Sequence, residues 1–148
     1  MAKFRFSLEK LLQIKKFKED QKAIELAVAQ AKLNRILQDK SNLTDKKGVY
    51  FTLPMKAEIN LQQLRAGNDY LLQINRQIKM AEKNITMAEK KVEEKRLLLT
   101  HANQEKRSVE LLREKHLLAF KKAENQTSMK NENEVALRML RDNGNNPV

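Results

Sequence analysis

The chain has 148 residues, of which 33% are charged and only 5% aromatic, and it contains 3 Gly, 2 Pro and neither Cys nor Trp. So few large side chains and turn formers argue against a sheet or a multilayered core, whereas 41% hydrophobic residues are too many for a fully disordered chain. The net charge of +11 favours an acidic partner, such as nucleic acid, anionic lipid or an acidic protein surface, without choosing among them.

The same composition bears on the compartment. Without Cys the chain has no disulfides or thiolate metal ligands, which permits a reducing compartment. The opening residues MAKFRF lack the apolar core of a signal peptide, and the longest run of large aliphatic residues is the leucines at 97–99. We therefore expect a cytoplasmic protein without an integral membrane segment.

A first helix is predicted over residues 7–47. Ser7 is a suitable N-cap, and Phe6 and Leu11 then occupy the two positions of a hydrophobic staple. At about 1.5 Å per residue this helix would be roughly 60 Å long. Its apolar residues drift between neighbouring lines, so we expect it to be less strictly heptad than the second helix. The early apolar face consists of Leu8, Leu11, Leu12, Ile14 and Phe17, and later members include Ile24, Leu26, Val28, Leu33, Ile36 and Leu43.

A turn is predicted over residues 48–59. Gly48 and Pro54 bracket an apolar, aromatic stretch and form the strongest break in the chain. Asn60 is a candidate N-cap for the next helix, with Gln63 as its capping-box partner.

The second predicted helix, residues 60–141, carries the clearest pattern in the chain. Two rows at heptad spacing run through it, and ten of their twelve positions are apolar. Lys95 and Lys106 are the exceptions. Their methylene stems could cover the seam, or the lysines could fix the register or mark the edge of the paired zone. The two rows are Leu71, Ile78, Ile85, Val92, Leu99, Lys106 and Ile74, Ala81, Ala88, Lys95, Ala102, Val109.

Together these helices predict an all-α fold of one elongated coiled-coil domain, in which an antiparallel hairpin has a longer, overhanging second helix. Folding about Pro54 leaves everything after about Ser108 unpaired. Apolar residues continue there at helical spacing, which implies a partner for them. Whether residues 125–133 interrupt the helix stays open, and residues 142–148 are expected to be disordered.

Enzymatic chemistry has little support in the sequence. The three glycines are too far apart for a phosphate loop, and His101 and His116 lack the i, i+4 spacing of a helical metal pair. We therefore expect no catalytic residue, no metal and no cofactor. Basic clusters are interleaved with carboxylates along the whole chain, so we expect no nucleic-acid partner, although a basic helical nucleic-acid binder remains an alternative. The aromatic residues gather near the N-terminus and the turn, either as contact sites or as end caps.

The N-terminal sequence resembles that of a known family. Residues 3–15, KFRFSLEKLLQIK, followed by EDQKA at 19–23, resemble the opening of the FliJ family of flagellar type III export proteins. Residues 112–116, LREKH, and 124–136 resemble a second block of that family. The plan of a short helix, a turn near residue 54 and a longer helix is also similar.

This resemblance implies a non-enzymatic protein of flagellum assembly and motility, similar to the central stalk of rotary ATPases. It implies binding to the export ATPase hexamer, which it would stimulate, through the end that carries both termini. It further implies contact with the membrane export gate protein near the turn, and with substrate chaperones, at the inner face of the cell membrane. Lys46 stands where other members carry an aromatic residue. The alternative is an export chaperone or substrate adaptor that does not enter the ring. The expected ATPase-binding residues are Phe4, Phe6, Leu8, Leu11, Leu12, Leu111, Leu112, Leu118 and Phe120, and the expected gate-binding residues are Leu43, Tyr50, Tyr70 and Ile74.

Overall fold

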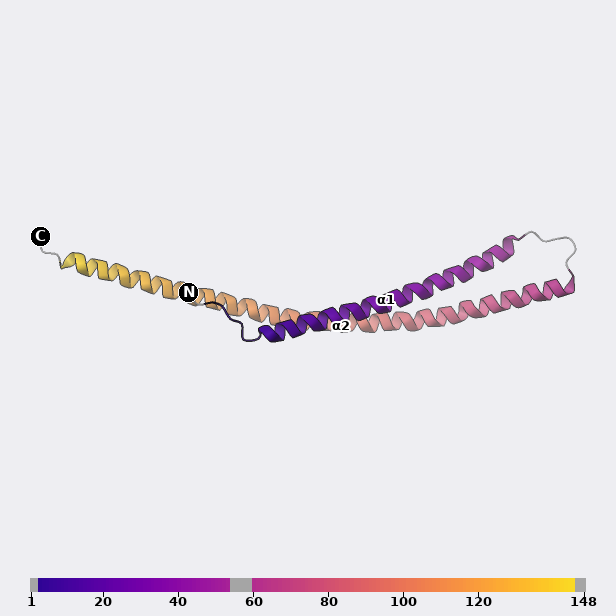
Figure 1. Ribbon diagram of the computed structural model, residues 1–148, viewed down its shortest axis with the longest axis horizontal. Helices are drawn as coiled ribbons and strands as arrows, with labels where there is room; N and C mark the ends of the chain where they lie inside the picture. The colour runs from indigo at the N-terminus through magenta and orange to yellow at the C-terminus, as the bar shows by residue number, and fades with distance from the viewer. Residues whose placement is uncertain (1–2, 54–59, 146–148) are drawn as a thin grey trace. The chain divides into compact units, whose positions relative to one another are not determined.

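The computed structural model describes residues 3–53 and 60–145 and consists of two helices, α1 (Glu9–Thr52, 44 residues) and α2 (Leu61–Gly144, 84 residues), packed against each other (Figure 1). Ion pairs join Lys15 to Glu105 and Lys40 to Glu82. A later residue of α1 therefore pairs with an earlier residue of α2, as in antiparallel helices. No strand occurs among the described residues. The predicted all-α antiparallel hairpin is confirmed.

The chain forms two compact units. The first contains the residues up to Phe17 and those from Asn103 onward, and the second contains Lys18–Ala102. Each unit holds a stretch of both helices.

Helix α1 begins at Glu9, where the Glu9 amide donates to the Phe6 carbonyl at 3.1 Å, and it runs five residues past the predicted end at residue 47. Gly48 was expected to start the turn, but it lies inside the helix with an ordinary negative φ. A single glycine costs a helix only about 1 kcal/mol, and packing of the following Tyr50 against α2 can offset that. The remainder of the predicted turn, including Pro54, falls outside the described residues.

Helix α2 starts where the capping pattern predicts. The Gln63 amide donates to the Asn60 side-chain oxygen at 2.9 Å, so Asn60 is the N-cap. The helix is continuous through residues 125–133 and ends at Gly144, so residues 142–144 are helical rather than disordered. No Pro or Gly separates Asn68 from Asn143, and nothing in the backbone forces an earlier end. Residues 146–148 lie outside the described residues.

The seam predicted for α2 is confirmed. All twelve heptad positions from Leu71 to Val109 are buried or half-buried, whereas most positions between them are exposed. Ile74, Ala81, Ile85, Val92 and Ala102 form the buried line of the second unit. Lys95 and Lys106 keep only 30% and 22% of their side chains exposed, as expected of lysines whose stems cover the seam.

Helix α1 is more regular than predicted. Its inward positions alternate at spacings of four and three residues along its whole length, which is a strict heptad. The prediction of a drifting stripe was wrong because charged residues occupy several seam positions, while Ile14, Ile24 and Val28 point outward and are exposed. The inward positions are Leu12, Lys15, Glu19, Lys22, Leu26, Ala29, Leu33, Ile36, Lys40, Leu43, Lys47 and Tyr50, and Leu8, just before the helix, continues the same spacing.

Candidate interaction surfaces

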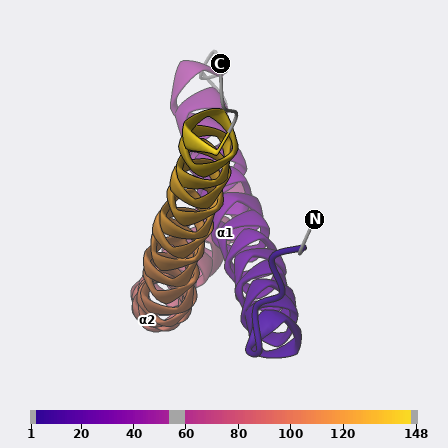
Figure 2. The same cartoon turned by 90° about the vertical axis from the view of Figure 1, so that its left-hand side faces the viewer.

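The first unit has its core where the N-terminal residues meet α2. Residues 3–8, the N-terminal strap, lead away from the first turn of α1 (Figure 2). The strap's Phe6 forms a buried cluster with Leu12 of α1 and Val109 of α2. Two ring contacts continue it, since the rings of Phe4 and Phe120 and those of Phe6 and His116 both have centroids 5.6 Å apart. The strap therefore covers one side of α2 over residues 109–120.

Charged side chains fix the strap and the start of α1. Arg113 donates through Nε to the Glu9 carboxylate at 3.1 Å, and its guanidinium lies 6.0 Å from the centre of the Phe4 ring. Lys15 pairs with Glu105 at 2.8 Å. These groups are partly exposed, so each pair contributes at most about 1 kcal/mol to the free energy of unfolding. Their main effect is to fix the alignment of α1 and the strap along α2.

The residues predicted to bind the ATPase fall into two groups. Phe6 and Leu12 are buried in the cluster, and Phe4, Leu8, Leu11 and Phe120 are half-buried around it. Leu111, Leu112 and Leu118 are exposed on α2. Only this second group offers an open apolar surface, while the first builds the end that presents it.

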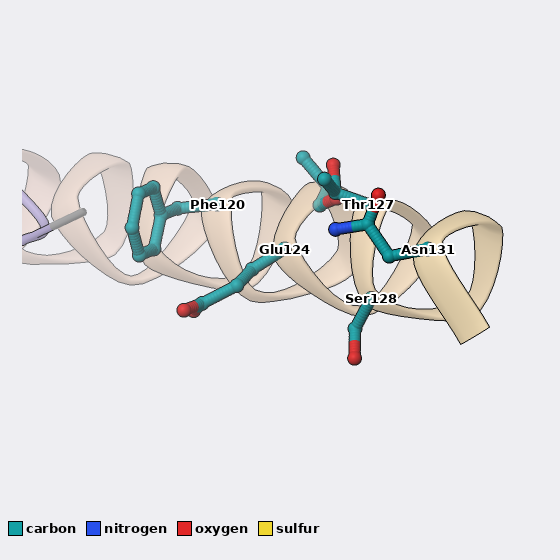
Figure 3. A pocket seen from close by; sticks show the side chains of 6 residues that line it. Phe120, Glu124, Thr127, Ser128 and Asn131 are labelled. Carbon is teal, nitrogen blue, oxygen red and sulfur yellow. The ribbon is translucent and has the colours of Figure 1, made fainter. Parts of the chain in front are cut away.

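Beyond Phe120, α2 has no covering helix. Every residue from 121 to 145, here called the terminal segment, is exposed. Figure 3 shows where it begins: Phe120, Glu124, Thr127, Ser128 and Asn131 line a shallow depression of mixed polar and apolar character on α2 alone. Exposed apolar residues gather further on, namely Met129, Val135, Leu137, Met139 and Leu140. Their helical spacing was visible in the sequence, but they were not included among the predicted site residues.

The second unit carries an aromatic cluster where α1 ends and α2 begins. The Tyr50 ring lies 5.5 Å from that of Tyr70 and 5.9 Å from that of Phe51. Tyr50 also covers Gly67, where a Cβ would collide with the phenol. The missing side chain at Gly67 therefore lets the Tyr50 ring lie directly on α2.

The last residues of α1 and the first of α2 also carry exposed apolar side chains, here called the turn-end patch: Val49, Phe51, Leu53, Leu61 and Leu64. Of these, Val49 and Leu53 line a shallow groove together with Tyr50 and Tyr70. Of the predicted gate-binding residues, Tyr50 and Tyr70 come together beside the patch. Leu43 is half-buried and Ile74 is buried, and both lie in the seam. The aromatic residues near the turn, including Phe51, were predicted as contact sites or end caps, but no member of the patch was among the predicted gate-binding residues.

Glu25 lies at the edge of the seam in the second unit, where it joins charges from both helices. Its carboxylate accepts hydrogen bonds from Lys95 at 3.2 Å and from Lys22 at 3.4 Å. The Lys95 ammonium, helped by that of Lys22, holds the pKa of the Glu25 carboxyl below its ordinary value. Lys95 thus has a fixed partner across the seam, which specifies alignment in the way that one polar core position can.

Two kinds of site are not found in the described part of the chain. No three His, Asp or Glu side chains there come close enough together to hold a metal ion. No helical stretch within the same residues is apolar enough over a sufficient length to span a lipid bilayer.

These features define a helical-hairpin protein with exposed apolar surfaces in each unit. The family model for the Flagellar FliJ protein matches residues 4–145, and the chain therefore belongs to the FliJ family. It is a protein of the flagellar export apparatus, in a family not known for enzymes. No curated protein and no solved structure shows a significant match to the chain.

Proposed function

We propose that this protein is a non-enzymatic, stalk-like adaptor that binds and stimulates the flagellar export ATPase ring and links it to the membrane export gate. The observation that carries the proposal is the uncovered part of α2. Over residues 121–145 every side chain is exposed, and large apolar residues recur to Leu140. Apolar side chains at helical spacing favour burial against a partner, and the family supplies an export machine as that partner.

The ATPase contact would use the exposed subset of the predicted residues. Leu111, Leu112 and Leu118 lie on α2 next to the terminal segment, and Val135, Leu137 and Leu140 extend the apolar surface along it. The strap and the buried cluster would hold this part of α2 straight and in place. A rod that binds one conformation of the ring subunits better than another shifts their populations, and this is how a protein without catalytic groups could raise ATP turnover.

The export gate contact would use the turn-end patch. Val49 and Leu53 line one shallow groove with Tyr50 and Tyr70, and Phe51, Leu61 and Leu64 add exposed apolar side chains on the same stretches of α1 and α2. Aromatic and aliphatic side chains in such a group are typical anchors of a protein interface. Through this contact the protein would be held at the inner face of the cell membrane.

The ATPase contact is tested with one leucine from each unit. Leu118 is 69% exposed and Leu97 is 62% exposed, so neither Leu118→Asp nor Leu97→Asp should perturb the fold. A carboxylate at the centre of an apolar interface costs about 2 kcal/mol or more, which is roughly thirtyfold in affinity. We expect Leu118→Asp to abolish stimulation of the purified cognate ATPase at protein concentrations where wild type and Leu97→Asp are fully active.

Equal stimulation by the two variants, or none by the wild type, would remove the ring contact from the proposal. Binding to export substrates or chaperones that persists in Leu118→Asp would then favour an adaptor acting without ring entry. Phe51→Asp tests the gate contact in the same way. It should lose binding to the isolated cytoplasmic domain of the gate protein, and it should still stimulate the ATPase.

A further inference from the structure

The second unit contains a groove between α1 and α2 that the proposed function does not use. Its floor is formed by Ile36 of α1 and Ala88 of α2, both half-buried members of the seam. Met87 borders this floor and is 70% exposed. An unbranched thioether side chain adapts to many partner shapes, so exposed Met is common on recognition surfaces.

The rim of the groove is basic. Lys32, Lys90 and Lys91 line it, against the single carboxylate of Glu94. No ion pair within the described residues involves any of these three lysines, whereas Lys40 and Lys95, elsewhere in the same unit, are paired across the helices. The groove therefore carries a net positive charge, and its three lysines form no ion pair among the described residues.

Apolar residues extend the same surface in both directions along α2. Met80 precedes Met87 by seven residues and Leu98 follows Lys91 by seven, and both are exposed. Residues seven apart lie on one face of a helix in a coiled coil. From residue 80 to residue 98 this face is about 27 Å long at 1.5 Å per residue, which matches a helix of about five turns.

We propose that this groove binds an acidic amphipathic helix of a partner protein, as a contact separate from the ATPase and the gate. The apolar side of such a helix would lie on Ile36, Ala88 and Met87, and its carboxylates would face the lysines of the rim. A second copy of this chain is a poor occupant, because it carries the same +11 charge and the same basic rim. Nucleic acid is disfavoured because the groove is lined by no aromatic residue on which bases could stack.

The probe is a fluorescein-labelled helical peptide of three heptads, with a Leu and Ile seam flanked by Glu. Its matched control has Lys in place of each Glu. Binding to the full chain is followed by fluorescence anisotropy at physiological salt. The groove variants are Met87→Glu and the double variant Lys90→Glu with Lys91→Glu. The control variants make the same changes in the terminal segment, at Met129 and at Lys121 with Lys122, which are also exposed.

We expect the Glu peptide to bind at least tenfold more tightly than the Lys peptide. Each groove variant should weaken it by about tenfold or more, and each control variant by less than about twofold. Equal weakening by groove and control variants would mean that the peptide senses only net charge, and would overturn the proposal. So would a single-stranded DNA oligonucleotide that displaces the peptide and loses affinity in the same groove variants. Met87→Glu should still stimulate the ATPase, so failure here is distinguishable from failure of the stalk function.

Discussion

Replacing Phe6 by Ala should detach the N-terminal strap from α2. Phe6 is only 8% exposed and packs with Leu12 and Val109. Truncating a well-buried Phe costs about 3–5 kcal/mol. The edge-on contact with His116 would contribute about 0.5–1.5 kcal/mol of that. Because the cluster is small and open on one side, we expect the lower end, a loss of about 3 kcal/mol in the free energy of unfolding.

The assay is urea denaturation followed by far-ultraviolet circular dichroism, combined with hydrogen exchange over residues 109–120. Phe17 provides a matched control, since it is the same residue type in the same unit and is 63% exposed. Phe17→Ala should change the free energy of unfolding by less than about 0.5 kcal/mol. If Phe6→Ala lies within about 1 kcal/mol of Phe17→Ala, with unchanged exchange on α2, the strap does not stabilise this unit as described.

Three further predictions concern the second unit. Gly67→Ala gains about 1 kcal/mol of helix propensity but displaces the Tyr50 ring, so stability should change little while the ring contacts vanish from the NMR spectrum. The Glu25 carboxyl has a lowered pKa beside Lys95, so its stabilising contribution is present above the ordinary carboxyl pKa and is lost as the pH falls through the lowered value. Ala102→Asp places a carboxylate at a position that is 3% exposed and should cost about 3 kcal/mol in urea denaturation.

Each of these three predictions can be decided by one comparison. If the Tyr50 ring still contacts Tyr70 in the Gly67→Ala variant, the inference that Tyr50 needs the missing side chain at Gly67 to pack on α2 is wrong. Glu25→Gln should flatten the acid limb of a stability-against-pH curve, and an unchanged curve would show that the ion pair makes no contribution. Ala119 is exposed, so Ala119→Asp should be tolerated, and an equal loss in both alanine variants would argue against a buried seam at Ala102.

The second helix could be predicted well because nearly all of its seam positions are apolar residues. Leu71, Ile78 and Ile85 share one row with Val92, and each lies inward as the spacing predicts. The first helix could not, because Lys15, Lys22 and Lys40 take seam positions that a search for apolar residues passes over. Lys15 and Lys40 lie inward because they pair with carboxylates on the other helix, Glu105 and Glu82. Such pairs cannot be predicted from the sequence until the alignment of the two helices is known.

The candidate surfaces were predictable only in outline. An excess of apolar residues after Ser108 was evident, but the sequence could not separate those that build the end from those that remain open. That division depends on the strap, which folds back so that Phe4 meets Phe120, more than one hundred residues away along the chain. Likewise, Tyr50 and Tyr70 were singled out as aromatic, yet their contact depends on Gly67, whose role required the structure.

The strap has a practical consequence for anyone who labels this protein. The Phe4 ring packs on that of Phe120, close to the part of α2 that is proposed to bind the ATPase ring. A fluorophore or affinity tag fused to the N-terminus would be attached only three residues before Phe4 in the sequence. Such a fusion could block assembly by its bulk alone and imitate a loss-of-function mutation. A reporter cysteine introduced at an exposed position of the second unit, for example Leu97, would avoid the proposed ATPase-binding surface.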